Sequence, residues 1–200
     1  MKCICDRKEE IMKYIQPCME QYFVESCQRI QRETEENGAE VWQELKDILR
    51  DLLQKIRIMQ EQNEKGEIQY FIFNFMESGV YTDKIEIYID ALDDGFYLDE
   101  QEAACSYCPC FLQELYQRDI EGLVRQIQKQ FIRLQEYEIV EVKRKYIELY
   151  DRIMYEMIKS LSELVVREIT GSGIKTAGML KIVYGRYMDK AVIVYAKEKG

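Results

Sequence analysis

The spacing of apolar residues changes abruptly between residues 42 and 76, and this change most restricts what the chain can fold into. One stretch repeats apolar residues every three or four positions, the period of a helix face: Trp42, Leu45, Leu49, Leu52, Ile56 and Met59. The next, residues 67–76 (E-I-Q-Y-F-I-F-N-F-M), has aromatic and β-branched side chains on both alternating faces. That pattern indicates a strand covered on both sides. The chain must therefore pack long helices against a sheet.

A second β-like run follows directly. Residues 85–91 alternate Ile85, Ile87, Ile89 and Ala91 with polar or amphipathic positions, as a half-solvated strand does. We expect the two runs to form a hairpin. Another pair of β-like runs, residues 179–184 and 191–196, lies near the end of the sequence and predicts a second hairpin.

The rest of the chain has helical spacing. A first helix runs from Cys5 to about Glu36, interrupted at Pro17, and ends at Asn37–Gly38. Two more are expected, at about 111–134 and 139–164, because the apolar phase breaks between Leu134 and Ile139. The glycines of residues 171–173 are expected to end the last helix.

These elements predict an α+β fold. Long α-helices would pack on one face of a four-stranded antiparallel sheet made of two β-hairpins, in a single domain over residues 1–200. An alternative organisation is an internal duplication with halves 1–100 and 101–200. The sequence G-x-Y-x-D-K occurs at 79–84 and again at 185–190, each time between two β-like runs. We interpret both copies as turns, with Tyr81 and Tyr187 packed over the sheet end and Asp83 and Asp189 closing the turn.

Charge and apolar run lengths exclude several kinds of partner. With 37 acidic and 28 basic residues the net charge is −9, which opposes binding to the phosphate backbone of nucleic acids. No apolar run approaches the roughly 20 residues that a membrane span requires. The start of the sequence becomes charged before a signal-peptide core can form. We therefore expect a cytoplasmic protein that binds neither nucleic acid nor membrane.

Cysteines supply one candidate site. Cys105, Cys108 and Cys110 form C-x-x-C-x-C, and Cys3 with Cys5 form C-x-C. Thiolates at such spacings can bind Zn²⁺ or an iron-sulfur cluster if the two groups converge. A redox-sensing dithiol is a second interpretation, and buried reduced thiols are a third. The count of seven and the lack of an export signal favour thiols in a reducing compartment.

Two other motifs are weaker. Residues 90–101 match a calcium loop at Asp90, Asp94 and Gly95, but Leu92 and Gln101 occupy positions that need oxygen ligands. A divalent-metal site built from carboxylates of this stretch is the one enzyme hypothesis that we retain, with Asp90, Asp93, Asp94 and Asp99. The stretch G-S-G-I-K-T, 171–176, lacks the Gly-Lys step and the preceding strand of a phosphate-binding loop.

The chain has no histidine, the side chain best suited to proton transfer near neutral pH. We therefore expect a non-enzymatic protein-interaction or regulatory module. Its helical stripes carry more apolar length than a four-stranded sheet can cover, which predicts self-association as a homodimer. The thiolate metal-binding or redox-sensing protein at 105–110 is the alternative.

Overall fold

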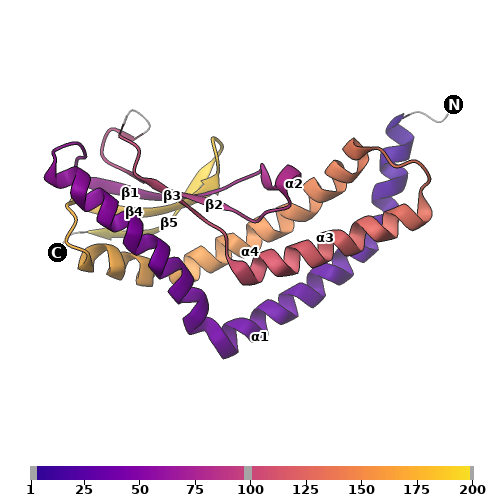
Figure 1. Cartoon of the computed structure of the whole chain (residues 1–200), viewed down its shortest axis with the longest axis horizontal. Helices are drawn as coiled ribbons and strands as arrows, with labels where there is room; N and C mark the ends of the chain where they lie inside the picture. Colours follow the sequence, from indigo (N-terminus) through magenta and orange to yellow (C-terminus); the bar gives the residue numbers. More distant parts are fainter. Residues whose placement is uncertain (1–3, 97–100, 199–200) are drawn as a thin grey trace. The chain divides into compact units, whose positions relative to one another are not determined.

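The computed structural model describes residues 4–96 and 101–198, with the side chains of 4–6 and 198 left aside. Within these residues the helices are α1 (Ile4–Glu61), α2 (Gly79–Thr82), α3 (Cys110–Gln130) and α4 (Glu136–Gly171), shown in Figure 1. The strands are β1 (Ile68–Phe75), β2 (Ile87–Leu92), β3 (Ala104–Tyr107), β4 (Thr176–Arg186) and β5 (Ala191–Glu198). The α+β class is confirmed.

The strands form one five-stranded mixed sheet in the order β3-β2-β1-β4-β5. β1 pairs antiparallel with β2, which confirms the first hairpin, and β4 pairs antiparallel with β5, which confirms the second. The two hairpins join through a parallel pairing of β1 with β4. The prediction of a four-stranded antiparallel sheet was therefore wrong in strand number and in the direction of the central pairing.

The described chain separates into two compact units, each assembled from three segments. Unit 1 contains the chain up to Gly38, Ser78–Ile85 and Cys110–Arg152, and unit 2 contains Ala39–Glu77, Glu86–Pro109 and the chain from Ile153 on. α1 and α4 contribute to both units. The boundary in α1 falls next to Asn37, whose φ of −128° and ψ of 22° interrupt the helical backbone.

Unit 1 is helical. The N-terminal part of α1 lies beside α3 and the N-terminal half of α4 (Figure 1). Their facing side chains are fully or almost fully buried, among them Ile15, Leu123 and Tyr146. α1 and α3 approach closely at Gly122, where a Cβ atom would overlap the Tyr22 hydroxyl group. The absence of a side chain at Gly122 thus leaves room for the end of the Tyr22 side chain.

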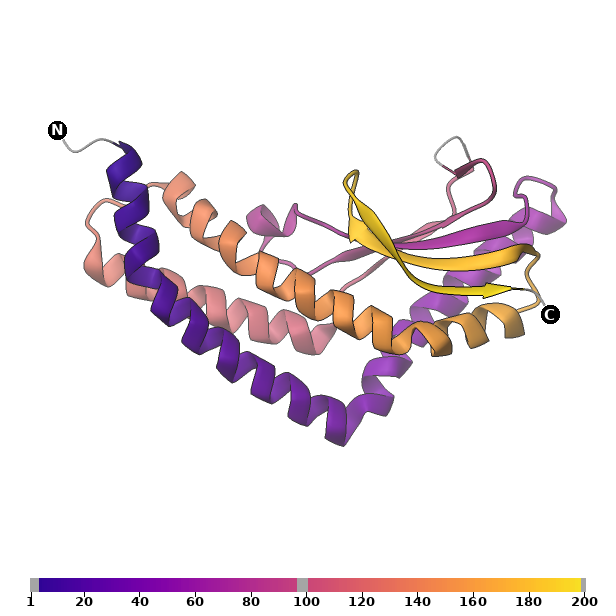
Figure 2. The same ribbon diagram turned by 180° about the vertical axis from the view of Figure 1, so that it is seen from behind.

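Unit 2 places helices on one face of the sheet. The C-terminal parts of α1 and α4 both cover that face (Figure 2). The strands present alternate residues to it, and these are buried: Phe71, Phe73, Phe75, Ile87, Ile89, Ala91, Leu180, Ile182 and Tyr184. The ring of Tyr155 on α4 contacts Tyr184 edge-on at 5.6 Å. The apolar pattern of both faces of β1 is explained by its central position in the sheet.

The opposite face of the sheet has a smaller apolar cluster. Ile72, Leu92 and Val183 are buried there, with Tyr70 and Phe96 packed against them. The Lys181 ammonium lies 5.0 Å from the centroid of the Tyr70 ring. This second cluster explains why β1 is apolar on its outer side as well.

The helix predictions hold in most respects. The two helices expected on either side of residues 134–139 are α3 and α4. Gly171 is the last residue of α4, and Gly173 has a φ of +79°, as expected for glycines that end a helix. The two helices expected in the first 60 residues together form α1, whose helical backbone is interrupted at Asn37. Pro17 lies within α1.

The two G-x-Y-x-D-K copies have different backbones. In the first, Gly79–Thr82 form the single-turn helix α2, and Asp83 has the left-handed φ of 55°. In the second, Gly185 is still in β4, and Met188 has the left-handed φ, at 62°. Tyr81 is 70% exposed and so does not pack over the sheet end. The shared letters therefore serve two kinds of turn.

Candidate functional site

The second hairpin carries the most concentrated exposed apolar surface of unit 2. Four of its large apolar side chains, which we call the hairpin surface, are 49–79% exposed: Tyr187, Met188, Val192 and Ile193. Tyr187 and Met188 lie in the β4–β5 turn. Val192 and Ile193 lie at the start of β5, where they pair with Tyr184 and Val183 and therefore project from opposite faces of the sheet. Large apolar side chains exposed together on one hairpin are a feature of protein-binding surfaces.

The turn that carries this surface is tightly held. The Asp189 amide donates to the Arg186 carbonyl at 3.0 Å, and the Tyr187 amide donates to the Phe75 carbonyl at 3.2 Å. A Cβ atom on Gly185 would lie 2.7 Å from the Ala191 Cα, so only glycine fits where β4 meets the start of β5. Met188 is 79% exposed at a left-handed φ of 62°, which costs about 1 kcal/mol for a residue other than glycine. The strained residue therefore displays a large apolar side chain.

β5 is an edge strand. In the described sheet it pairs with β4 on one side, and the order β3-β2-β1-β4-β5 places it last. Its outer backbone N–H and C=O groups thus face away from the sheet. An edge strand of this kind is a template for pairing with another chain.

A buried polar network forms the centre of unit 1. The Asp119 carboxylate on α3 is fully buried. One oxygen accepts hydrogen bonds from Ser26 of α1 at 2.5 Å and from Tyr146 and Tyr150 of α4 at 2.7 and 3.0 Å. The other accepts from the Arg118 guanidinium at 2.6 and 3.0 Å. The carboxylate thereby joins three helices.

This network has the properties of a structural connection. Burial raises the pKa of Tyr146 and of Tyr150, and the hydrogen bonds to Asp119 and its charge raise both pKa values further. Both phenols therefore remain protonated donors at neutral pH. Because every oxygen of the carboxylate is engaged by donors of the same unit, Asp119 fixes the helices and is not presented to a ligand.

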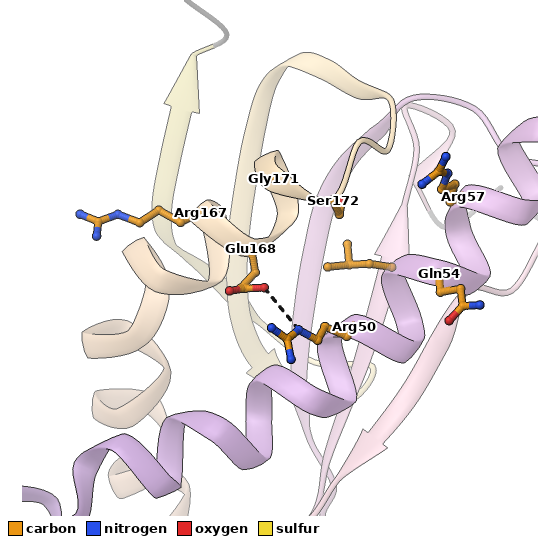
Figure 3. A pocket seen from close by; sticks show the side chains of 8 residues that line it. Arg50, Gln54, Arg57, Arg167, Glu168, Gly171 and Ser172 are labelled. Atoms are coloured by element: carbon orange, nitrogen blue, oxygen red, sulfur yellow. Dashed lines mark ion pairs between the residues drawn. The ribbon is translucent and has the colours of Figure 1, made fainter.

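A groove between α1 and α4 in unit 2 has a volume of about 390 Å³. Its charged lining includes Arg50, Arg57, Arg167 and Glu168, as Figure 3 shows. Arg50 points toward Glu168, whereas Arg167 points away from the other labelled side chains (Figure 3).

Glu168 also accepts from Lys46 at 2.5 Å, and Arg57 pairs with Glu61 at 3.1 Å. α4 ends at Gly171 beside this groove, and the partial negative charge of a helix C-terminus opposes an anionic ligand. We interpret the groove as a contact between α1 and α4 that is held by ion pairs.

The cysteines of the predicted metal site lie in different elements of the structure. Cys105 lies in β3 opposite Ile89, Cys108 follows β3, and Cys110 begins α3. Cys3 lies outside the described residues, as does the side chain of Cys5. Burial raises the pKa of the Cys105 thiol to about 11, which disfavours the thiolate that binds metals or reacts. In the described part of the chain, no three His, Cys, Asp or Glu side chains are placed to hold a metal ion. The Zn or iron-sulfur site stays a prediction.

The carboxylates of the acidic stretch 90–101 also lie in different elements of the structure. Asp90 is in β2, and the Asp93 carboxylate accepts a hydrogen bond from the Gly95 amide at 2.9 Å, which forms a local turn. Asp94 is exposed in the same turn, and Asp99 falls in the undescribed segment. Strand β3, Ala104–Tyr107, follows this stretch.

We compared the chain with models of protein families, with curated proteins and with solved structures, and it matches none of them. Over the described residues, no helix combines the length and apolar character needed to cross a bilayer. The class supported by the fold is thus an α+β protein with a five-stranded mixed sheet.

Sequence reasoning missed the hairpin surface and the Asp119 network. The apolar pattern of residues 191–196 suggests burial, yet Val192 and Ile193 are 51% and 59% exposed. Asp119 interrupts the apolar stripe of Leu115, Ile120 and Leu123. The position of the charged Asp119 on an apolar helix face was the sequence signal that this residue is buried with a polar partner.

Proposed function

We propose that the protein is a non-enzymatic interaction module that self-associates as a homodimer through the hairpin surface. The observation that carries this proposal is the exposure of Tyr187, Met188, Val192 and Ile193 on the edge hairpin of the sheet. Burying such side chains contributes roughly 25 cal/mol per Å² of apolar surface removed from water.

The occupant that we favour is a second copy of the chain. An edge strand is self-complementary, because two copies related by a two-fold axis can present the same strand to each other. Strand pairing across such an interface would satisfy outer backbone groups of β5 as well as cover its apolar side chains.

The polar groups of both units support a non-enzymatic role. Asp119 and Glu168 are engaged by neighbouring donors in their own units. We propose the cytoplasm as its location, because an odd count of seven cysteines favours thiols in a reducing compartment.

The first test changes one residue of the hairpin surface. Ile193→Thr keeps a β-branched side chain and removes apolar surface, so the fold should persist while the dimer dissociates. Light scattering after size-exclusion chromatography is expected to give a dimer mass for the native chain and a lower average mass for the variant. Circular dichroism should show unchanged secondary structure.

Ile132→Thr is the matched control. Ile132 is 83% exposed but belongs to unit 1 and is not part of the hairpin surface. Its substitution should leave the dimer mass unchanged. A monomeric native chain at all accessible concentrations, or equal loss of mass in both variants, would refute the proposal.

A further inference from the structure

The interruption of α1 contains a pair of residues that can react with each other. Of the asparagines in the chain, which are Asn37, Asn63 and Asn74, Asn37 is the one that glycine follows. The backbone nitrogen of the next residue can attack an asparagine side chain, and glycine favours the attack because it has no side chain to obstruct the approach. The step from Asn37 to Gly38 is therefore a candidate for spontaneous chemical modification.

The local structure leaves this step open to the reaction. The φ of −128° and ψ of 22° at Asn37 show that the peptide bond to Gly38 is not held in the helical direction. A Cβ atom on Gly38 would have no neighbour within 4 Å, so the peptide has room to rotate toward the Asn37 side chain. The flanking residues Glu36 and Ala39 are exposed, which gives water access to the step.

The other two asparagines are placed differently. Asn63 is exposed just beyond the end of α1, but the amide of Glu64, which would have to attack it, donates to the Met59 carbonyl at 2.9 Å. Asn74 is 4% exposed within β1, a strand that is paired on both sides. Both are followed by residues larger than glycine. We therefore expect both to persist.

We propose that Asn37 is a site of spontaneous deamidation in the folded protein. The Gly38 backbone nitrogen loses its proton to hydroxide and forms a bond with the Asn37 Cγ atom, while the bond from Cγ to Nδ2 breaks. Nδ2 takes up a proton from water and leaves as ammonia, and the product is a cyclic succinimide. Water then opens the ring at either carbonyl carbon, which gives aspartate or isoaspartate at this position.

The product changes the charge at the interruption of α1. In the unmodified chain the Asn37 side-chain amide donates to the Glu33 carboxylate at 2.8 Å. A carboxylate in its place cannot donate, and it lies one helical turn from Glu33, where like charges repel each other. Isoaspartate also lengthens the backbone by one carbon atom. Deamidation therefore replaces a favourable contact by a repulsive one and weakens α1 next to the boundary of unit 1.

Incubation of the folded full-length chain at mildly alkaline pH, followed by peptide mass spectrometry over several days, tests the site. Asn37 should convert to a mixture of aspartate and isoaspartate, while Asn63 and Asn74 stay unchanged. Digestion in heavy-oxygen water labels any residue that is converted during the digestion, because ring opening takes its oxygen from water. Such late conversion is thereby separated from conversion in the folded chain.

Gly38→Ala is the matched variant for the reaction. The added methyl group meets no neighbour, so the chain should fold, and conversion of Asn37 should slow at least about tenfold. Asn37→Asp has the charge of the product without the reaction. Its midpoint of thermal unfolding should be lower than that of the native chain by about 1–2 °C.

Three results would overturn the modification site. They are an Asn37 that stays unchanged in the folded chain while the urea-unfolded chain converts it, equally fast conversion at Asn63, and an undiminished rate in Gly38→Ala. An Asn37→Asp variant at least as stable as the native chain would contradict the weakening of α1. None of these measurements depends on self-association.

Discussion

Two neighbouring tyrosines show how strongly the effect of one hydroxyl depends on its partner. Tyr146 and Tyr116 are both fully buried, and their rings stack with centroids 6.4 Å apart. The Tyr146 hydroxyl donates to Asp119 at 2.7 Å. The Tyr116 hydroxyl is buried with no hydrogen-bond partner among the described residues.

Phenylalanine at these two positions should therefore have opposite effects. Tyr146→Phe removes a hydrogen bond to a charged group and should lower the free energy of unfolding by about 2 kcal/mol. Tyr116→Phe removes a buried hydroxyl that lacks a partner and should raise it by about 1 kcal/mol. Urea unfolding followed by circular dichroism measures both. Equal destabilisation by the two substitutions would show that the Asp119 network is not what distinguishes them.

Asp119 itself illustrates a residue that sequence reasoning could not place. Its neighbours Ile120 and Leu123 fit the helical stripe, and the stripe predicts only that this face is buried. The donors that make burial of its charge tolerable come from Ser26, Tyr146 and Tyr150, on two other helices. Such long-range pairing leaves no periodic signal in the sequence, whereas its absence would be costly in the fold.

The helices and most strands could be predicted because each has its own period. α3, α4, β1, β2, β4 and β5 all lie where the spacing of apolar residues indicated. β3 could not be predicted in this way, since its sequence A-C-S-Y is short and has no alternation. The parallel pairing of β1 with β4 joins strands that lie far apart in the sequence, such as Phe71 with Ile182, so no local pattern contains it.

The position of each strand in the sheet also could not be predicted from the local sequence pattern. Residues 67–76 and 191–196 are similarly apolar, yet β1 is central and β5 is at the edge. Only the strand order distinguishes a covered strand from one that displays its side chains. The hairpin surface follows from that order and from the strained turn at Met188.

Two glycines in unit 1 should respond oppositely to alanine. At Gly38, beside the break in α1, a Cβ atom would have no neighbour within 4 Å, so Gly38→Ala should raise the free energy of unfolding by about 0.5–1 kcal/mol. At Gly79, which begins α2, a Cβ atom would overlap the Lys84 carbonyl oxygen.

Gly79→Ala should accordingly lower the free energy of unfolding by about 1–3 kcal/mol, because a backbone atom must move. Thermal unfolding of the two variants beside the native chain is sufficient to compare them. A destabilising Gly38→Ala would mean that the break at Asn37 needs glycine as its neighbour.

Each compact unit combines residues from both halves of the sequence, and α1 and α4 run through both units. Unit 1 has the buried Asp119 network at its centre, and unit 2 carries the sheet with the exposed hairpin. We therefore assign the structural connection to unit 1 and the proposed self-association to unit 2. A single domain and a duplication into halves 1–100 and 101–200 both remain predictions.

The net charge of −9 bears on how the whole chain associates. Two copies repel each other over distances up to roughly the Debye length, about 10 Å at 0.1 M salt. The short-range contacts proposed for β5 must overcome this repulsion. The segment from Met188 to Lys197 carries Asp189, Lys190 and Lys197, so the proposed contact is locally less acidic than the chain as a whole.

Hydrogen exchange at two protein concentrations tests the central claim of β5 self-pairing most directly. Amides of the peptide that covers residues 189–197 should exchange more slowly in a concentrated sample than in a dilute one, because the dimer protects the outer groups of β5. Peptides from α3 in unit 1 serve as the internal reference and should not change. Exchange of β5 that is independent of concentration, or protection that appears in α3 instead, would contradict the account.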